Sequence, residues 1–106
     1  MEPVDVARLD RVIHEAARLA IVSVLAPRRE VAFTELRDLL GLSDGNLSVH
    51  LGKLGEAGYV SLSKEFVSKK PRTSVSLTRK GRTALSRHLD VLEAIVKAAR
   101  RGPDRK

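Results

Sequence analysis

The stretch LSDGNLSVHLGKLGEAGYV, residues 42–60, decides the fold, because it combines a helix start, a helix stop and the beginning of a strand. Ser43 or Asp44 offers an N-cap, since short polar side chains accept hydrogen bonds from the free N–H groups of a first helical turn. Gly58 suits the left-handed position that follows a helix C-terminus. The stretch therefore predicts a helix over residues 43–57 that is followed directly by a strand.

The two faces of this predicted helix differ in character. At 100° per residue, Leu47, Leu51 and Leu54 fall within about 60° of one another, so we expect them to face a core. The opposite arc carries small and polar residues, namely Gly45, Asn46, Ser48, Val49, Gly52, Lys53 and Glu56, with His50 and Ala57 at its edge. Gly52 and Gly55 each cost a helix interior roughly 1 kcal/mol relative to Ala. We therefore expect a ligand that approaches this backbone closely.

The major groove of DNA is a candidate for that ligand, because it admits a helix and is read by short hydrogen-bonding side chains and by contact with thymine methyl groups. Asn46 and Ser48 suit base edges, and Val49 suits a methyl contact. Lys53 suits a phosphate. His50 fits two interpretations, a DNA contact or a histidine packed at the helix edge with a satisfied hydrogen bond. The candidate DNA contacts of this helix are Ser43, Asn46, Ser48, Val49, His50 and Lys53.

A second short helix precedes this one. Thr34 offers an N-cap to a helix that runs through Leu40, and Gly41 ends it. Residues 31–33 are long enough for a minimal strand before that helix. Two short helices joined by residues 41–43 predict a helix-turn-helix.

Apolar residues alternate with serine in residues 60–63 and 74–77, which predicts two strands that form a hairpin. We call this hairpin, residues 60–77, the wing, and its outer part, residues 66–73, the wing tip. The connection, roughly residues 66–72, carries three cations and a proline, which suits the DNA backbone. The alternative is a solvated loop whose charges prevent aggregation. The candidate DNA contacts of the wing tip are Ser68, Lys69, Lys70, Arg72 and Thr73.

The formal net charge of +7 is unevenly distributed. Residues 1–63 hold seven Arg or Lys against nine Asp or Glu, whereas residues 64–106 hold thirteen against four, a net charge of +9. This excess fits a polyanionic partner or, alternatively, a solvated basic surface. One Tyr, two Phe and no Trp are too few platforms for binding single strands or RNA by base stacking.

Apolar residues recur at helical spacing near both ends of the chain. Residues 5–26 predict one helix, or a short helix followed by a longer one. Thr78 is expected to cap a helix that ends near Ala99, roughly 30 Å long, whose apolar stripe a small domain can hardly cover. The surplus predicts a homodimer through the first and last helices, unless these helices cover each other within one chain. The candidate interface residues are Leu9, Ile13, Leu85, Leu89, Leu92 and Val96.

Length and composition limit the remaining possibilities. The 106 residues allow one domain, which we place over residues 1–99, followed by a basic tail over residues 100–106 that we expect to be disordered. The sequence matches no signal peptide and no membrane span, so we expect a cytoplasmic protein. His14-Glu15 begins a zinc-protease motif whose second histidine is replaced by Arg18, and the chain has no cysteine. We therefore expect no enzyme, no metal and no cofactor.

The chain resembles the winged-helix transcriptional regulators of the MarR and ArsR types. The resemblance covers about residues 9–92 and lies in the stretch 42–60, in KEFVSKKPRTSVSLT (64–78) and in LTRKGRTAL (77–85). It implies an α+β, mainly α fold, a winged helix-turn-helix with a two- to three-stranded antiparallel wing and a long C-terminal helix. It also implies a dimer on a palindromic operator, with the helix 43–57 in the major groove and the wing tip near the adjacent minor groove. ArsR-type metal sensing is not expected, because the chain has no Cys and only three His.

Three functions fit these observations. The first is a dimeric, sequence-specific regulator of transcription that binds double-stranded DNA and represses by occupying its operator. The second is a winged-helix protein-interaction module that uses its apolar terminal helices on a foreign partner. The third is a chromatin-like protein that coats DNA without sequence preference. No convergent polar cluster in the sequence identifies a small-molecule effector.

Overall fold

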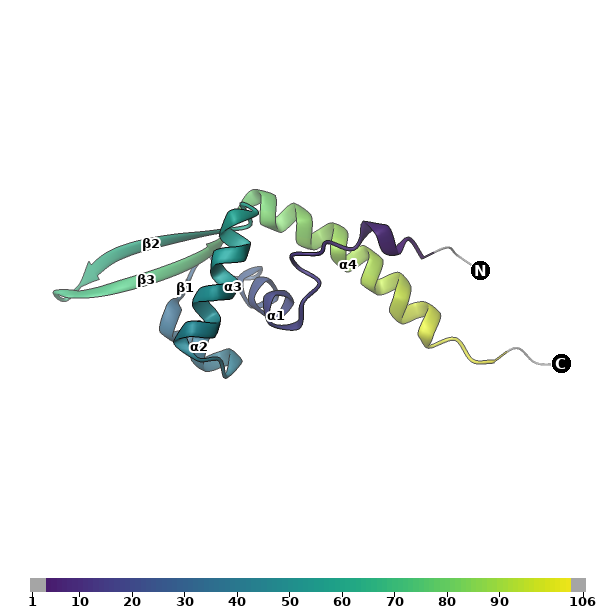
Figure 1. Cartoon of the computed structure of the whole chain (residues 1–106), viewed down its shortest axis with the longest axis horizontal. Helices are drawn as coiled ribbons and strands as arrows, with labels where there is room; N and C mark the ends of the chain where they lie inside the picture. The colour runs from purple at the N-terminus through teal and green to yellow at the C-terminus, as the bar shows by residue number, and fades with distance from the viewer. Residues whose placement is uncertain (1–3, 104–106) are drawn as a thin grey trace.

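The computed structural model describes residues 4–103 as a helical body from which a hairpin and a long last helix project (Figure 1). Its elements are the 3-10 helix η1 (Val6–Arg8), α1 (Ala16–Leu25), β1 (Val31–Ala32), α2 (Phe33–Leu40), α3 (Asp44–Glu56), β2 (Val60–Val67), β3 (Lys70–Leu77) and α4 (Arg79–Ala99). This order confirms the predicted α+β, mainly helical fold class. The molecule is elongated, with extents of 69 × 25 × 22 Å, because the wing and the end of α4 project in opposite directions.

The core lies where α1, α2 and α3 meet the base of the sheet. The three leucines that were predicted to face inward from α3 are at most 2% exposed. They belong to one cluster with buried residues of the other elements, among them Ile21, Val22, Leu25, Leu36, Val60 and Val75. Burial of each such side chain contributes about 1.5–3 kcal/mol. The core therefore determines which face of α3 is turned outward.

The sheet is antiparallel, with strand order β1-β3-β2. Val31 of β1 pairs with Val75, and β2 pairs with β3 along its whole length, from Val60 opposite Leu77 to Val67 opposite Lys70. Because β1 contributes only two residues, the outer part of the wing is a two-stranded ribbon (Figure 1).

The turn of the wing is shorter than the sequence predicts. The expected connection over residues 66–72 is wrong, because Ser68 and Lys69 alone form the turn, with φ of 52° and 67°. Two left-handed residues in succession are typical of a type I′ turn, whose twist matches that of the strands. Phe66 pairs with Pro71. The second pair from such a turn is not hydrogen-bonded, so the missing N–H of Pro71 costs the ladder nothing.

The apolar segment at the N-terminus forms a short and a longer helix, the second of the two predicted arrangements. Between η1 and α1, Asp10 Oδ1 accepts hydrogen bonds from the N–H groups of Val12 and Ile13 at 2.9 and 3.1 Å. The Glu15 side chain caps α1 by accepting from two N–H groups of its first turn. These bonds between side chain and backbone compete with helical ones and therefore interrupt the helix.

The predicted N-cap Thr34 is wrong. Helix α2 begins at Phe33, with Ala32 at the N-cap position and no side-chain cap hydrogen bond. Ala32 is extended there because it still pairs with Ser74 in the sheet. The end of α2 is as predicted, since Gly41 is left-handed, with a φ of 64°.

Helix α4 begins in tight contact with the segment that follows α3. Thr78 caps it as predicted, because its Oγ1 accepts from the Gly81 N–H at 3.0 Å and donates to the Gly58 carbonyl oxygen at 2.6 Å. A Cβ on Gly81 would overlap the Tyr59 carbonyl oxygen, so only glycine fits there.

The far half of α4 extends away from the body (Figure 1). Residues 100–103 of the predicted tail follow α4, exposed and outside any helix, and residues 104–106 lie outside the described residues. Neither α4 nor any other helix within residues 4–103 is long and apolar enough to cross a membrane.

Candidate DNA interface

The outward face of α3 carries the side chains that were predicted to contact bases. Asn46, Ser48 and Lys53 are exposed, and Val49 is 58% exposed. Ser43 caps the helix, because its Oγ accepts from the Asn46 N–H at 3.1 Å. The face therefore offers hydrogen-bonding groups and one apolar group, which is the chemistry that reads a major groove.

Glycines make this face of α3 low and flat. A Cβ added at Gly45, Gly52 or Gly55 would meet no atom of the described chain within 4 Å. Packing within residues 4–103 therefore gives no reason for Gly52 and Gly55, although each costs the helix roughly 1 kcal/mol. A surface outside the chain that approaches the backbone does give a reason.

His50 lies at the inner edge of this face, where α1 holds it. Arg18 Nη1 lies 3.2 Å from His50 Nδ1, and because a guanidinium only donates, His50 Nδ1 is the acceptor. Glu15 Oε2 lies 3.6 Å from the same nitrogen. His50 thus has the packed, hydrogen-bonded arrangement, and a DNA contact through its other ring nitrogen stays a prediction.

Glu15 and Arg18 are residues of this region that sequence patterning did not identify. The Arg18 N–H, and then the Ala17 N–H and the charge of Arg18, lower the pKa of Glu15 against the opposing effect of burial. The ionised carboxylate lies 3.9 Å from the Arg18 guanidinium, which donates to His50, and so it helps to fix α3 on α1 through Arg18. The available signal was the presence of polar residues within an otherwise apolar helical segment.

Arg37 joins the two helices of the helix-turn-helix. Its Nη1 donates to Asp44 Oδ1 at 2.8 Å and its Nε donates to Asp38 Oδ1 at 2.9 Å. Asp38 and then Asp44 raise the pKa of Arg37 above its ordinary value. Because Ser43 is the N-cap of α3, Asp44 is not the cap; it lies in the first turn of α3 and pairs with Arg37 of α2. The pair is exposed, so its main effect is to position α3 and not to stabilise the fold.

The wing tip presents cations in solvent. Lys69, Lys70 and Arg72 are exposed, and Thr73 at the inner end is half-buried. Type I′ turns favour Asn-Gly, whereas Ser68 and Lys69 occupy this one. A residue other than glycine in the left-handed region costs about 1–2 kcal/mol. The turn therefore carries a cation at a position where glycine would be more stable.

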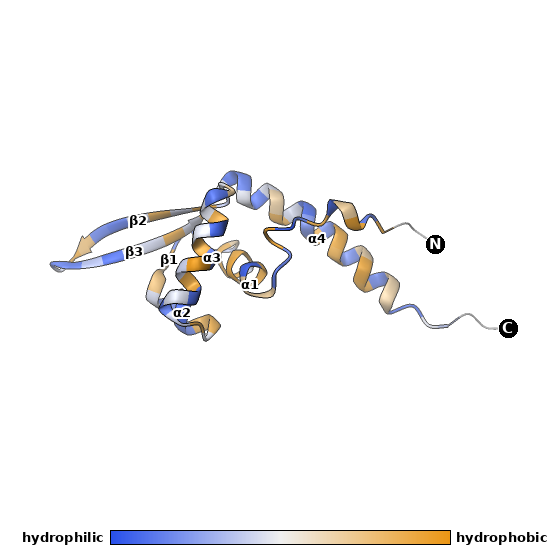
Figure 2. Ribbon diagram, in the orientation of Figure 1, coloured by the Kyte–Doolittle hydropathy of each residue, from blue (hydrophilic) through white to orange (hydrophobic). Residues whose placement is uncertain are grey.

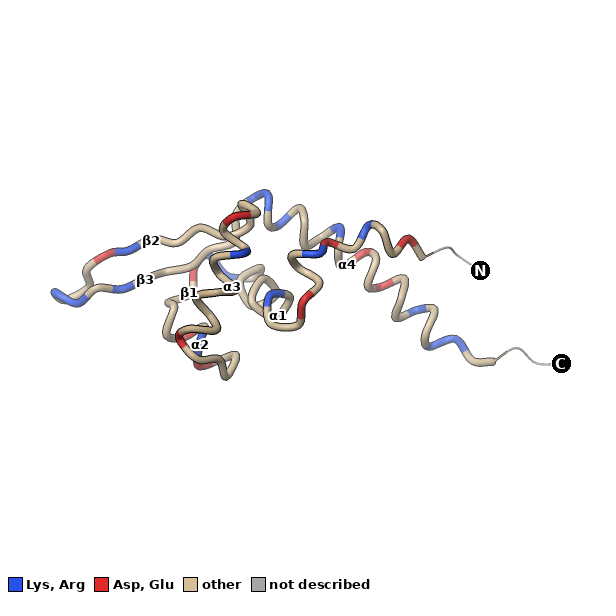
Figure 3. The backbone as a smooth tube through the Cα atoms, in the orientation of Figure 1, with Lys and Arg blue, Asp and Glu red and all other residues tan. Residues whose placement is uncertain are grey.

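Part of the remaining positive charge is engaged within the chain. Figure 3 shows Lys and Arg at the wing tip, over the first turns of α4 and near its end. Arg82 Nη1 donates to the Ala26 carbonyl oxygen at 2.7 Å, and the Lys80 ammonium lies 5.9 Å from the centre of the Tyr59 ring. Because the wing tip projects from the body, its cations are better placed than those of α4 to neutralise phosphates.

The terminal segments leave apolar surface exposed. Two of the six candidate interface residues, Ile13 and Leu85, are at most 5% exposed and lie in the core of the chain itself. The other four keep accessible surface, which is partial for Leu9 and Leu92, 39% for Leu89 and 47% for Val96. Helix η1 lies along α4 (Figure 1), so the terminal helices cover each other only in part.

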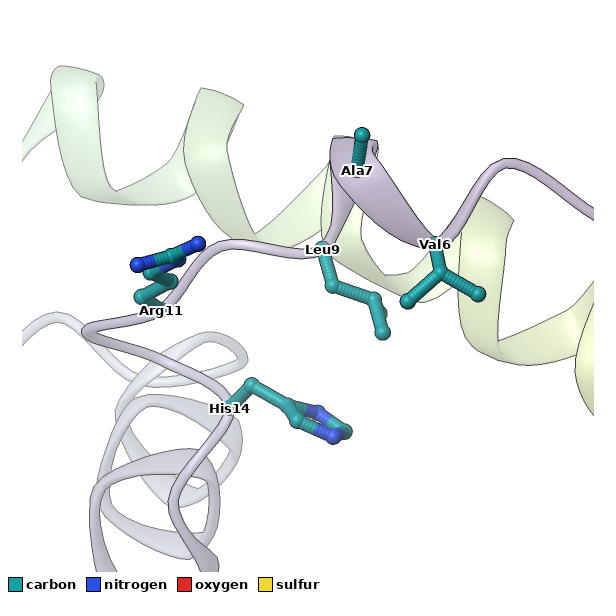
Figure 4. A pocket seen from close by; sticks show the side chains of 5 residues that line it. All are labelled: Val6, Ala7, Leu9, Arg11 and His14. Carbon is teal, nitrogen blue, oxygen red and sulfur yellow. The ribbon is translucent and has the colours of Figure 1, made fainter.

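A hollow of about 400 Å³ lies beside η1. Figure 4 shows its lining side chains, which are Val6, Ala7, Leu9, Arg11 and His14. Leu9 points toward the His14 ring, and His14 Nδ1 lies 3.3 Å from His88 Nε2 of α4. Two polar side chains in a mostly apolar lining do not identify a ligand. Within the described residues, no group of three His, Cys, Asp or Glu side chains could hold a metal ion.

Known proteins share this fold. Residues 17–96 match the family of winged helix DNA-binding domains. An uncharacterised protein of Methanocaldococcus jannaschii is 32% identical over 79 residues, which is 74% of this chain and 86% of that protein. The structure of a transcriptional regulator homologue from Pyrococcus horikoshii OT3 has a TM-score of 0.81 at 30% identity, covering 87% of this chain and 91% of the other. The structure of MarR has a TM-score of 0.73 at 18% identity, covering 83% and 64%.

The fold and the candidate interface together define a winged helix-turn-helix protein. The chain belongs to the family of winged helix DNA-binding domains, and it has the fold of the MarR-type regulators. The resemblance that was drawn from the sequence is therefore confirmed.

Proposed function

We propose that this protein is a cytoplasmic, dimeric regulator of transcription that binds double-stranded DNA in a sequence-specific manner and represses by occupying its operator. One observation carries the proposal. Gly52 lies on the outward face of α3 and Gly55 is exposed at its flank, both without a packing role in the described chain, and the cationic wing follows the same helix. Membership of a DNA-binding family and the regulator homologue from Pyrococcus favour this function over an enzyme.

The proposal divides the work between α3 and the wing. Helix α3 carries Lys53 against Asp44 and Glu56, so it adds little favourable charge and is suited to reading base edges. The wing tip supplies Lys69, Lys70 and Arg72 for phosphates. Ser43, Asn46, Ser48 and Val49 would then lie in the major groove, with the wing tip on the backbone and minor groove beside it.

The proposed dimer forms through α4 and the N-terminal segment. Leu89 and Val96 are one stripe of α4 that the described chain leaves exposed, and Val6 of η1 is 64% exposed beside it. Leu9 and Leu92 extend this surface. A second copy that covers it would place two recognition helices about one helical turn of DNA apart.

Selection of bound sites from random duplex DNA, performed with the purified protein at two salt concentrations, tests the proposal. We expect an enriched inverted repeat whose half-sites lie about 10 base pairs apart, centre to centre. Equal affinity for random and selected duplexes would support the chromatin-like function instead. A monomer in sedimentation without DNA affinity at low salt would support a protein-interaction module.

A further inference from the structure

Phe66 has the most exposed large apolar side chain of residues 4–103, with 78% of its surface accessible. Val60, at the base of the same strand, is only 6% exposed, so the core ends well before Phe66. Figure 2 shows apolar residues again at the outer end of β2, beyond the helical body. Packing within the described chain therefore does not explain a phenylalanine at this place.

Phe66 and Pro71 form an apolar pair on one face of the wing tip. They are direct partners in the register of β2 and β3, and side chains in such a pair lie about 4.5–5.5 Å apart at Cβ. Lys64 shares their face, because strand side chains alternate with a period of two. Val67, the next residue, lies on the other face. The tip thus carries the apolar pair on one face and Val67, paired with Lys70, on the other.

The charges around the pair indicate the class of partner. Lys64 lies on the face of the pair, Lys69 lies in the turn, and Lys70 and Arg72 lie on the other face of the same ribbon. The single acidic residue of the wing, Glu65, lies opposite Arg72 in the register. This balance disfavours a second copy of the wing and favours a polyanion. An apolar side chain among cations is the arrangement of proteins that insert a wedge between base pairs from the minor groove.

The wing is long enough to reach such a groove while α3 occupies the neighbouring major groove. The eight residues of β2, at about 3.3 Å each, carry its outer end roughly 25 Å from its base. Along DNA, the next minor groove lies about half of a 34 Å helical turn away. Because Val60 follows the last residue of α3 by only four positions, both contacts fit one duplex.

We infer that Phe66, supported by Pro71, enters the minor groove beside the α3 contact, partly unstacks one base step and bends the duplex. The inference rests on the proposed function and adds a second means of selecting sequence. Lys69 in the turn, and Lys70 and Arg72 on the other face of the ribbon, hold phosphates along the same groove. Flexible pyrimidine–purine steps unstack most easily, so the protein prefers them at a position that α3 does not contact.

The test measures the bend of a selected operator whose ends carry a fluorescence donor and acceptor. We expect the wild-type protein to bend the duplex by an angle in the range of about 20–90° that such wedges produce. Phe66→Ala should reduce this angle by more than half and weaken binding by roughly tenfold, as expected for a lost contact between an aromatic ring and a base. Phe66→Leu should retain most of the bend. Val67→Ala is the matched control, since Val67 is 46% exposed on the other face, and should behave as wild type.

Three results of the bending assay would overturn the inference: a straight duplex with wild-type protein, an unchanged bend with Phe66→Ala, or an equal loss of bend with Val67→Ala. A change in the sedimentation of DNA-free protein by Phe66→Ala would also overturn it, because the pair would then join two copies. Failure of the proposed function would be a separate result: the wild-type protein would show no preference for any selected duplex over random DNA.

Discussion

Asn46 and Arg72 represent the two proposed kinds of DNA contact. Arg72→Ala should weaken binding to every sequence and reduce the slope of log affinity against log salt by about one unit, because one phosphate contact is lost. Asn46→Ala should instead lower discrimination at particular base pairs by about 1–3 kcal/mol, because a base contact is lost. Titrations of operator and random duplexes at several salt concentrations measure both effects. Equal behaviour of the two variants would contradict the division of work between α3 and the wing.

His88 makes the stability of the fold depend on pH. It is fully buried, its Nδ1 accepts from the Asp10 N–H at 3.0 Å, and its Nε2 lies 3.3 Å from His14 Nδ1. Burial, and then the charge of His14, lower the pKa of His88 below 6.5, although Asp10 acts in the opposite direction. The neutral form is therefore the one that the fold favours.

The unfolded chain takes up a proton on His88 at higher pH than the folded chain does. The stabilisation is therefore complete above pH 6.5 and is lost as the pH falls from there through the lowered pKa. Urea unfolding at a series of pH values should show a falling free energy of unfolding in this window. His88→Asn keeps an acceptor for Asp10 but does not titrate, so its curve should be flatter. A variant with the wild-type pH dependence would show that other groups are responsible.

Among the secondary structure elements, those with strong local signals were predictable. Ser43 and Gly58 define α3 because capping depends on a few neighbouring residues, and Thr78 defines the start of α4 for the same reason. The break before α1 was not predictable in position, because it depends on Asp10, which is held by Tyr59 and His88 from distant segments. The turn at Ser68 and Lys69 was missed because it lacks the Asn-Gly signal of its type.

Gly81 and Gly52 should respond oppositely to substitution by alanine. At Gly81 the new Cβ would overlap the Tyr59 carbonyl oxygen, so Gly81→Ala should destabilise the fold by at least about 1–3 kcal/mol. At Gly52 the Cβ meets nothing within the described chain, so Gly52→Ala should stabilise the helix by up to about 1 kcal/mol and yet weaken operator binding. Thermal unfolding and a binding titration measure the two effects. A stable Gly52→Ala protein with full DNA affinity would contradict the proposal that DNA approaches the backbone of α3 closely at this position.

For the molecule as a unit, sequence periodicity could predict surplus apolar surface but not its exact location. Ile13 and Leu89 have the same helical spacing as their neighbours, yet Ile13 is fully buried and Leu89 is 39% exposed. The difference arises because the chain turns between η1 and α1 and directs Ile13 into the core. Only the tertiary arrangement shows which part of each stripe remains available to a second copy.

Leu89→Glu combined with Val96→Glu should convert the proposed dimer into a folded monomer, because the charges would have to be buried in the interface. Sedimentation should show the smaller species, and affinity for an inverted repeat should fall toward that for a single half-site. Leu39→Glu is the control, since Leu39 is 58% exposed on α2, outside the proposed interface. A double variant that still sediments as a dimer would place the interface elsewhere.

The close contact of Gly81 with Tyr59 couples the start of α4 rigidly to the segment that follows α3. The 21 residues of α4, at 1.5 Å each, form a rod roughly 30 Å long between the recognition helix and the far end of the proposed interface. A tilt of about 6° at one end of such a rod moves the other end by about 3 Å, close to the 3.4 Å rise of a base pair. In the proposed dimer, the spacing of half-sites would therefore be set by the crossing angle of two α4 helices. Substitutions in that distant packing would change operator spacing while leaving the bases that are read within each half-site unchanged.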